Sequence, residues 1–287
     1  MNIVMLSNDE FRLKSFIKWM PDENFDDCHF YMVTDDNKFD FGDRLKKILK
    51  EQDRIKHWSI HTISNIITMY KHRYGLSEEA EKLIEKTKCV LIKPLLLGYF
   101  NKMPGLSKFM YIDDDVLFIK NIREMYNKYD NCITCMGRKC ALPEKDSYIL
   151  DDLNEIMGSS ITLENLKQNG VNAGVVILTR SDDKLMDYAI KFIDGESVKK
   201  KLSGRTRSGV LDERFLSAFF LKINGSSFIW PKEIRLEDRR KPIADRLTAR
   251  NFFHMNVDVN YKRLVDCYEY NEEKDSVVRI REDIVID

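Results

Sequence analysis

Short apolar runs alternate with amphipathic stretches along the first part of the chain. Residues 3–6 and 30–33 are apolar runs closed by polar turn residues, which predicts two buried strands. Residues 9–20 and 44–52 carry apolar side chains at helical spacing, and Pro21 ends the first of these helices. The order strand, helix, strand, helix predicts an α/β fold in which a mainly parallel central sheet is flanked by helices.

The remainder of the chain continues this pattern less regularly. Residues 60–70 fit either a strand or a helix. The basic segment 199–209 predicts a mobile loop, which is either a solvated linker or a flap that closes over a ligand. Ser181 is the expected N-cap of a helix. Further helices are predicted at residues 77–86, 89–100, 119–126, 181–192 and 211–220, and further strands at 109–112, 132–136, 171–178, 277–278 and 284–286.

Composition and charge narrow the functional class. The chain has 287 residues, of which 43% are hydrophobic and 33% charged, and its 47 basic and 47 acidic residues balance. A neutral chain gives no support to nucleic acid or an anionic membrane as a partner. No apolar stretch approaches the ~20 residues of a membrane span, no secretory signal is visible, and the six cysteines are scattered. We therefore expect a cytoplasmic protein with reduced thiols.

Three of the cysteines, Cys132, Cys135 and Cys140, form a C-x2-C-x4-C cluster. A structural zinc site needs four ligands at suitable spacings, and the neighbouring sequence offers no fourth Cys or His. Buried strand thiols are therefore favoured over a zinc site.

Three consecutive carboxylates interrupt an apolar run in the middle of the chain. Asp113, Asp114 and Asp115 stand between Phe-Met-Tyr-Ile and Val-Leu-Phe-Ile. Ionised carboxylates are costly to bury without compensation, so a divalent cation is expected beside them. On an extended backbone Asp113 and Asp115 project from one face and Asp114 from the other. The motif therefore predicts an enzyme that handles a diphosphate through a metal ion.

Together with three other segments, this D-x-D motif resembles the GT-A-fold glycosyltransferases, in particular glycosyltransferase family 8 and glycogenin-like enzymes. The other segments are the turn after the first strand, an Asn-Ala-Gly segment with a later Asp-Glu pair, and a histidine near the C-terminus. The resemblance covers about residues 1–260. It implies one GT-A (Rossmann-like) domain over residues 1–287, with a nucleotide-binding part at about 1–120, a sugar and acceptor part at about 121–260 and a small C-terminal tail at about 261–287.

The resemblance also implies a set of donor-binding residues. Asn8 would hydrogen-bond the base of a nucleotide-sugar, and Phe11 would stack on that base. Lys93 would contact a phosphate or the sugar, and Asp114 would face the same donor. Lys262 is the candidate for the lysine that grips the diphosphate, although its spacing from the histidine differs from that in the family.

The same resemblance implies a metal site made of Asp113, Asp115 and His254. Hard carboxylate oxygens suit Mn²⁺ or Mg²⁺. The ion would bridge the two phosphates of the bound nucleotide and neutralise the leaving diphosphate.

Three further residues are implied beside the transferred sugar. Asn172, in the Asn-Ala-Gly segment, and Asp212 would serve sugar hydroxyls. Glu213 stands where many relatives have glutamine. A carboxylate beside the anomeric carbon can act as a nucleophile or as an ion-pair stabiliser, and the sequence leaves both roles open.

Together with the D-x-D motif, the resemblance implies a metal-dependent, retaining hexosyltransferase. It would move a hexose from a nucleoside-diphosphate sugar, with a UDP-hexose as the expected donor, to a hydroxyl on a glycan, a protein or a small molecule. Two alternatives stay open. A phosphatase of the haloacid dehalogenase type also uses D-x-D at a strand end, and a sugar-nucleotide-binding protein would bind the donor without turnover.

Overall fold

The computed structural model describes most of the first 224 residues and three short strands beyond them. The described ranges are 1–35, 41–87, 89–118, 122–135, 147–168, 171–180, 184–203, 211–224, 252–254, 268–271 and 276–279.

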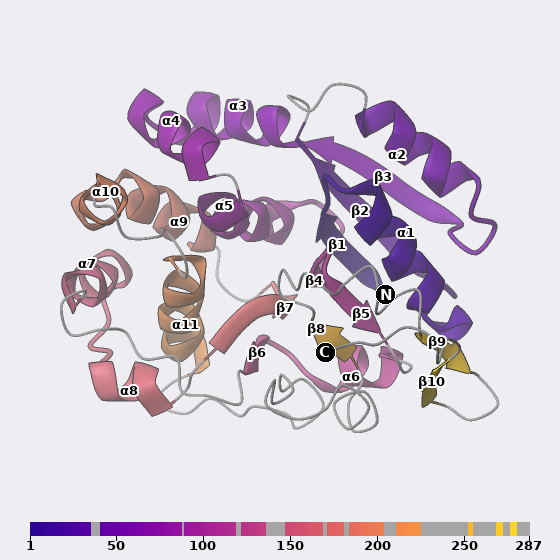
Figure 1. Cartoon of the computed structure of the whole chain (residues 1–287). Coiled ribbons are helices and arrows are strands. Elements are labelled where there is room, and N and C mark those ends of the chain that lie inside the picture. Colours follow the sequence, from indigo (N-terminus) through magenta and orange to yellow (C-terminus); the bar gives the residue numbers. More distant parts are fainter. Residues whose placement is uncertain are drawn as a thin grey trace.

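The core of the molecule is a 6-stranded sheet in the order β3-β2-β1-β4-β7-β6 (Figure 1). Strands β3, β2, β1 and β4 pair in parallel, whereas β7 runs antiparallel to both of its neighbours. The predicted α/β fold with a mainly parallel central sheet is confirmed. The strands are β1 (Asn2–Leu6), β2 (His29–Thr34), β3 (His57–Thr62), β4 (Lys108–Asp113), β6 (Cys132–Cys135) and β7 (Val171–Thr179).

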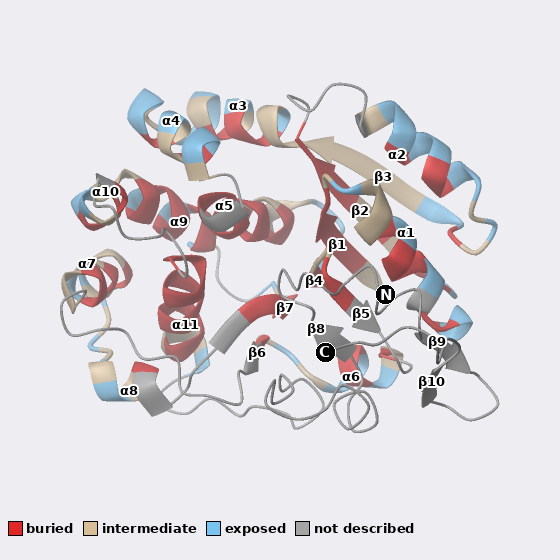
Figure 2. Cartoon of the chain, in the orientation of Figure 1, coloured by how far each residue is buried: buried red, intermediate tan, exposed pale blue. Residues whose placement is uncertain are grey.

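Helices cover both faces of this sheet because the central strands are apolar on both sides. Ile3 and Met5 of β1 join a core with α1 and α2, whereas Val4 and Leu6 face a second core that contains α3, α5, α9 and α11 (Figure 2). The helices are α1 (Glu10–Trp19), α2 (Phe41–Lys50), α3 (Ile63–Tyr74), α4 (Glu78–Thr87), α5 (Cys89–Lys102), α6 (Arg123–Lys128), α7 (Ser147–Met157), α8 (Leu163–Gln168), α9 (Leu185–Asp194), α10 (Glu196–Ser203) and α11 (Leu211–Asn224).

Helix α5 is enclosed in the second core. Pro94 lies inside it, and the Tyr70 hydroxyl donates a 2.6 Å hydrogen bond to the carbonyl of Leu95. Gly98 allows close packing, since a Cβ there would lie 2.8 Å from the Tyr70 hydroxyl and 3.1 Å from the Cα of Met186 on α9. This packing fixes the height of α5 above the sheet, and α5 carries Lys93.

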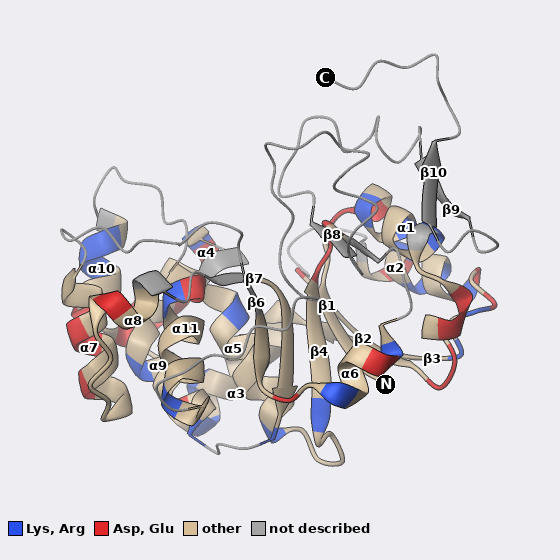
Figure 3. Ribbon diagram, turned by 90° about the horizontal axis from the view of Figure 1, so that it is seen from below, with Lys and Arg blue, Asp and Glu red and all other residues tan. Residues whose placement is uncertain are grey.

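Charged residues lie mainly on the helices and turns, and the sheet strands are almost uncharged (Figure 3). In the part of the chain that the structure describes, no helix is both long and apolar enough to cross a bilayer.

Two short strand pairs accompany the main sheet. Strand β5 (Val116–Phe118) pairs antiparallel with β8 (Phe252–His254), and β9 (Tyr268–Asn271) pairs antiparallel with β10 (Ser276–Arg279). The strand predicted at residues 277–278 is therefore confirmed, and the one at 284–286 lies outside the described residues.

Several element predictions need correction. The ambiguous segment 60–70 is divided between β3 and α3. Lys199–Ser203 belongs to α10 and is not loop, because Val198 and Leu202, one helical turn apart, are buried against the second core. Helix α9 begins at Leu185 with Lys184 at its N-cap, and the expected cap Ser181 lies outside the described residues. Helices α7 and α8 were not predicted.

Candidate active site

The candidate site lies at the topological switch point of the sheet, where the strand order reverses between β1 and β4. The chain runs outward through β1, β2 and β3 and then returns to place β4 on the other side of β1. The carboxyl ends of β1 and β4 meet there, with Leu6 opposite Asp113. Ligands of open α/β sheets bind at such a point. The turn after β1 and the D-x-D motif are therefore neighbours.

The first aspartate of the motif ends β4 and is held by two side chains. Tyr111 donates a 2.9 Å hydrogen bond from its hydroxyl to Asp113, and the Lys93 Nζ lies 3.0 Å and 3.1 Å from the two carboxylate oxygens. Asp114 and Asp115 form the turn into β5, and Asp115 is buried, with 7% of its surface exposed. The strand alternation expected across the whole motif therefore stops at Asp113.

Asp114 faces the opposite side from Asp113 and contacts the start of α1. Its carboxylate accepts 3.1 Å hydrogen bonds from the Ser7 hydroxyl and from the Arg12 guanidinium. Burial raises the pKa of Asp114 to about 6; Arg12 opposes this, and the neighbouring aspartates add to it. The predicted donor contact of Asp114 stays a prediction.

Lys93 joins three elements beneath the site. It reaches from α5 to Asp113 on β4, to the carbonyl of Ala173 on β7 at 3.0 Å, and to Asp212 on α11 at 3.3 Å. Burial opposes a charge on this amine, but the surrounding carboxylates outweigh it and raise the pKa of Lys93 above its usual value. The lysine therefore stays cationic and balances acids from two elements.

Asp212 and Glu213 occupy the first turn of α11, and both are 8% exposed. Burial raises the pKa of Glu213 to about 7, and the adjacent Asp212 adds to the rise, whereas Lys93 and the backbone of Ala173 oppose it. Glu213 is therefore a buried acid that titrates near neutrality. The structure brings Lys93, Asp113, Asp212 and Glu213 together, as a shared site would require.

The residues predicted to bind the base follow β1. The Asn8 side-chain oxygen accepts hydrogen bonds from the Thr34 hydroxyl at 3.2 Å and from the Asp35 backbone N–H at 2.7 Å, which ties the ends of β1 and β2 together. Phe11 is half-buried in the first turn of α1. Both residues lie at the expected edge of the sheet.

The remaining predicted residues are described in part or not at all. The backbone of Asn172 lies in β7 beside Ala173, opposite Thr134, and its side chain is not among those described. His254 in β8 is the register partner of Val116, the residue after Asp115, so its backbone reaches the D-x-D motif across the β5–β8 pair (Figure 1). Lys262 lies outside the described residues.

The metal site cannot be assembled from the described side chains alone. Among them, no group of three or more His, Cys, Asp or Glu residues is arranged to hold an ion. Two carboxylates of the motif with an imidazole from β8 would supply a donor set that suits Mn²⁺ or Mg²⁺. Cys132, by contrast, is a buried free thiol whose pKa is raised to about 11, chiefly by burial, as expected for a strand thiol.

Sequence reasoning missed three side chains that support the motif. Tyr111 precedes Asp113 by two residues, so strand alternation could have placed both on one side. Ser7 and Arg12 flank the predicted base-binding residues, but nothing in the sequence pairs them with Asp114. That pairing depends on the register between β1 and β4.

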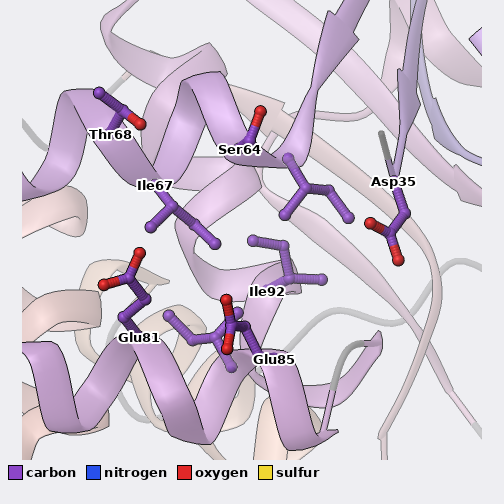
Figure 4. Close-up of a pocket in the computed structure, with 9 residues that line it drawn as sticks. Asp35, Ser64, Ile67, Thr68, Glu81, Glu85 and Ile92 are labelled. Carbon is purple, nitrogen blue, oxygen red and sulfur yellow. The ribbon is translucent and has the colours of Figure 1, made fainter. Parts of the chain in front are cut away.

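A pocket of about 450 Å³ opens next to the predicted base site (Figure 4). The carboxylates of Glu81 and Glu85 on α4 and of Asp35 after β2 line it together with isoleucines that include Ile67 and Ile92. Asp35 lines the pocket, and its backbone N–H binds the Asn8 side chain, so the pocket adjoins the predicted base site. Sequence reasoning did not predict this pocket.

The fold is that of the GT-A glycosyltransferases. Mouse xyloside xylosyltransferase 1 in its apo form is similar with a TM-score of 0.52 and 11% identity, over 90% of this chain and 98% of that chain. The predicted resemblance and fold class are thereby confirmed. No protein-family model and no curated protein matches the sequence.

Two further neighbours have lower TM-scores. The galactosyltransferase LgtC, in complex with donor and acceptor sugar analogs, gives a TM-score of 0.43 and 14% identity over 77% of this chain and 70% of that chain. The glycosyltransferase GlyE of Streptococcus pneumoniae, in its apo form, gives a TM-score of 0.40 and 12% identity, over 76% of this chain and 42% of that chain. The likeness to the xylosyltransferase, at 11% identity, shows a shared fold and nothing of the activity.

Proposed function

We propose that this protein is a metal-dependent glycosyltransferase that moves a hexosyl group from a UDP-sugar to a hydroxyl acceptor with retention at the anomeric carbon. The observation that carries the proposal is the convergence, at the switch point of the sheet, of the D-x-D turn with Lys93, Asp212 and Glu213. Charged side chains are costly to bury at the edge of an apolar sheet unless other charges in the protein balance them or a polar ligand binds them. The acids at this site outnumber Lys93, so the imbalance favours a bound ligand.

The residues have separate tasks in this proposal. Asp113, Asp115 and His254 would hold Mn²⁺ or Mg²⁺. When bound, the ion would supply Lewis-acid stabilisation of the leaving diphosphate. Asn8 and Phe11 would bind the base, and Asp212 and Asn172 would orient the sugar hydroxyls. Lys93 holds Asp113 and Asp212 in place.

Glu213 lies next to Asp212 and would stand beside the anomeric carbon. In its ionised form it would stabilise positive charge at that carbon or attack it. Because its pKa is about 7, a large part of the population is ionised at neutral pH, and that part rises toward pH 8. We expect turnover to increase over this interval.

Binding is the first test of the proposal. The protein would be heated with UDP-glucose, UDP-galactose, UDP-xylose or GDP-mannose, each with Mn²⁺, Mg²⁺ or EDTA. A ligand at about 100 times its Kd stabilises the folded state by about 2.7 kcal/mol, which a melting curve resolves. We expect stabilisation by a UDP-sugar that requires the metal. Equal melting temperatures in every well would refute the proposal.

Turnover separates an enzyme from a binding protein. Release of UDP from the selected donor, with and without sugar acceptors, would be followed in wild type, Asp115→Asn and His254→Ala. Both variants should lose metal-dependent release, and Asp43→Asn, which changes an exposed acid on α2, should retain it. Tight binding without any release would favour the alternative of a sugar-nucleotide-binding protein. The glycosyltransferase fold argues against the phosphatase alternative.

A further inference from the structure

The middle aspartate of the motif and the first helix form a link that the proposed chemistry does not use. Asp114 accepts one hydrogen bond from Ser7, on the turn after β1, and one from Arg12, on α1. The Asp114 side chain is only 15% exposed, and that of Arg12 is 31% exposed. This ion pair is therefore more shielded than the other pairs on α1, such as Lys14 with Glu10, at 56% and 41%.

Arg12 is itself fixed at two points. Its backbone N–H donates a 3.1 Å hydrogen bond to the side chain of Asp9, the N-cap of α1. Its guanidinium lies 3.1 Å from Asp114. One residue thus connects the turn that carries Asn8 with the turn that carries Asp114 and Asp115.

The motif needs such a connection because two of its three aspartates lie in a turn. Regular strand hydrogen bonds end at Asp113 and resume at Val116, so the sheet does not fix the orientation of Asp114 and Asp115. Tyr111 and Lys93 hold Asp113 from one side. Ser7 and Arg12 hold Asp114 from the other side. The turn is clamped between these two pairs.

We propose that Arg12, acting through Asp114, is a positioning residue that sets Asp113 and Asp115 for metal binding and couples the metal site to the base-binding turn. This inference rests on the proposed function. Residues that orient metal ligands typically change metal affinity 10–100-fold when they are replaced. Loss of the Arg12–Asp114 pair should therefore weaken metal binding without removing any ligand.

The test measures Mn²⁺ affinity in the full chain by calorimetry, in the presence of UDP, for Arg12→Met, Asp114→Asn and the double variant. Each single variant should bind Mn²⁺ about tenfold more weakly than wild type. The double variant should be no weaker than the weaker single variant, because both changes break the same link. Arg12→Lys, which keeps the charge, should recover part of the loss.

The matched control is Lys14→Met. It removes another cation and another ion pair from α1, two residues away and on an exposed position, and it should bind Mn²⁺ as wild type does. If Arg12→Met fails to fold by circular dichroism, Ser7→Ala removes the second hydrogen bond to Asp114 and should weaken binding in the same direction.

The outcomes separate the two proposals. If wild type itself binds no Mn²⁺ in the presence of UDP, the proposed function fails. If wild type binds and Arg12→Met or Ser7→Ala binds within twofold of it, only the positioning role fails. Additive losses in the double variant would also overturn it, since Arg12 would then act by a route that does not include Asp114.

Discussion

At the scale of single residues, the site is a small set of charges that keep one another in place. Lys93 is 6% exposed and contacts carboxylates from β4 and α11, so it is a buried cation shared by acids of two elements. Glu213 lies at the margin of this set and has the raised pKa expected of an acid with too little compensation. The contribution of Lys93 to stability and the raised pKa of Glu213 can both be measured without a substrate.

Lys93→Met should destabilise the protein by about 3 kcal/mol, because removing one partner of a buried pair leaves the other charge uncompensated. Urea unfolding at pH 7.5 would measure the loss. Lys71→Met is the comparison: its ion pair with Glu81 is partly exposed to solvent, so the expected loss of stability is much smaller. Equal losses in the two variants would contradict the buried balance around Lys93.

Glu213→Gln should change how stability depends on pH. The folded pKa of about 7 lies above the ordinary value of 4.5, so between these values only the folded state holds the proton. The contribution of this group is therefore complete below about pH 4.5 and is lost as the pH rises through 7. In metal-free protein, the free energy of unfolding of wild type should fall by on the order of 3 kcal/mol more than that of the variant between pH 4.5 and 8. Parallel profiles would exclude the raised pKa.

At the scale of elements, helix α5 determines where the buried cation stands. Its close approach to α3 and α9 depends on the missing side chain at Gly98, beside the Tyr70 hydroxyl and Met186. Helix α5 also lines the pocket through Ile92. A change in its packing should therefore reach both the pocket and the site.

Gly98→Ala should destabilise the protein by about 1–3 kcal/mol, since a Cβ would press on the backbone of α9. Gly42→Ala, in helix α2 with nothing within 4 Å of the added Cβ, should stabilise it by about 0.5–1 kcal/mol. Chemical unfolding of the two variants compares the same substitution in opposite surroundings. A change of the same sign in the free energy of unfolding of both variants would contradict the tight packing at Gly98.

Elements with a clear period were predictable, and those that depend on tertiary contacts were not. The apolar runs of β1, β2, β4 and β7 are short and buried on both faces, so their sequence alone indicates strands. Helix α10 was missed because its lysines, among them Lys199 paired with Glu79, mask a buried pair of apolar residues. Segment 60–70 was ambiguous because a half-exposed edge strand continues directly into α3.

The candidate site was predictable to the extent that its chemistry is local. Asp113–Asp115 and Asp212–Glu213 are visible as acids in apolar surroundings. The links between them were not visible, because Lys93 reaches Ala173 and Asp212 only after β7 has paired with β4. The same holds for Arg12 and Asp114, which are 102 residues apart in the chain.

At the scale of the whole molecule, the main sheet is formed by the first part of the chain, whereas the candidate metal site also needs a residue near the C-terminus. All strands of the 6-stranded sheet lie within residues 2–179, and α11 ends at Asn224. Strand β8, with His254, begins at Phe252 and pairs with the short strand β5. Folding of the sheet and completion of the site should therefore be separable.

A chain that ends at residue 224 should keep the helical and strand content of the sheet domain but lose metal-dependent UDP binding. Circular dichroism would report the first property and calorimetry with Mn²⁺ and UDP the second. His254→Ala in the full chain is the companion variant and should reproduce the binding loss. Undiminished Mn²⁺ affinity in the shortened chain would remove β8 from the site.

The late position of β8 has a consequence during synthesis. A ribosome adds residues in order, so every strand of the main sheet is synthesised well before the partner of β5. A nascent chain can thus form its scaffold first. Under the proposed function, metal-dependent donor binding would be completed only when β8 is in place.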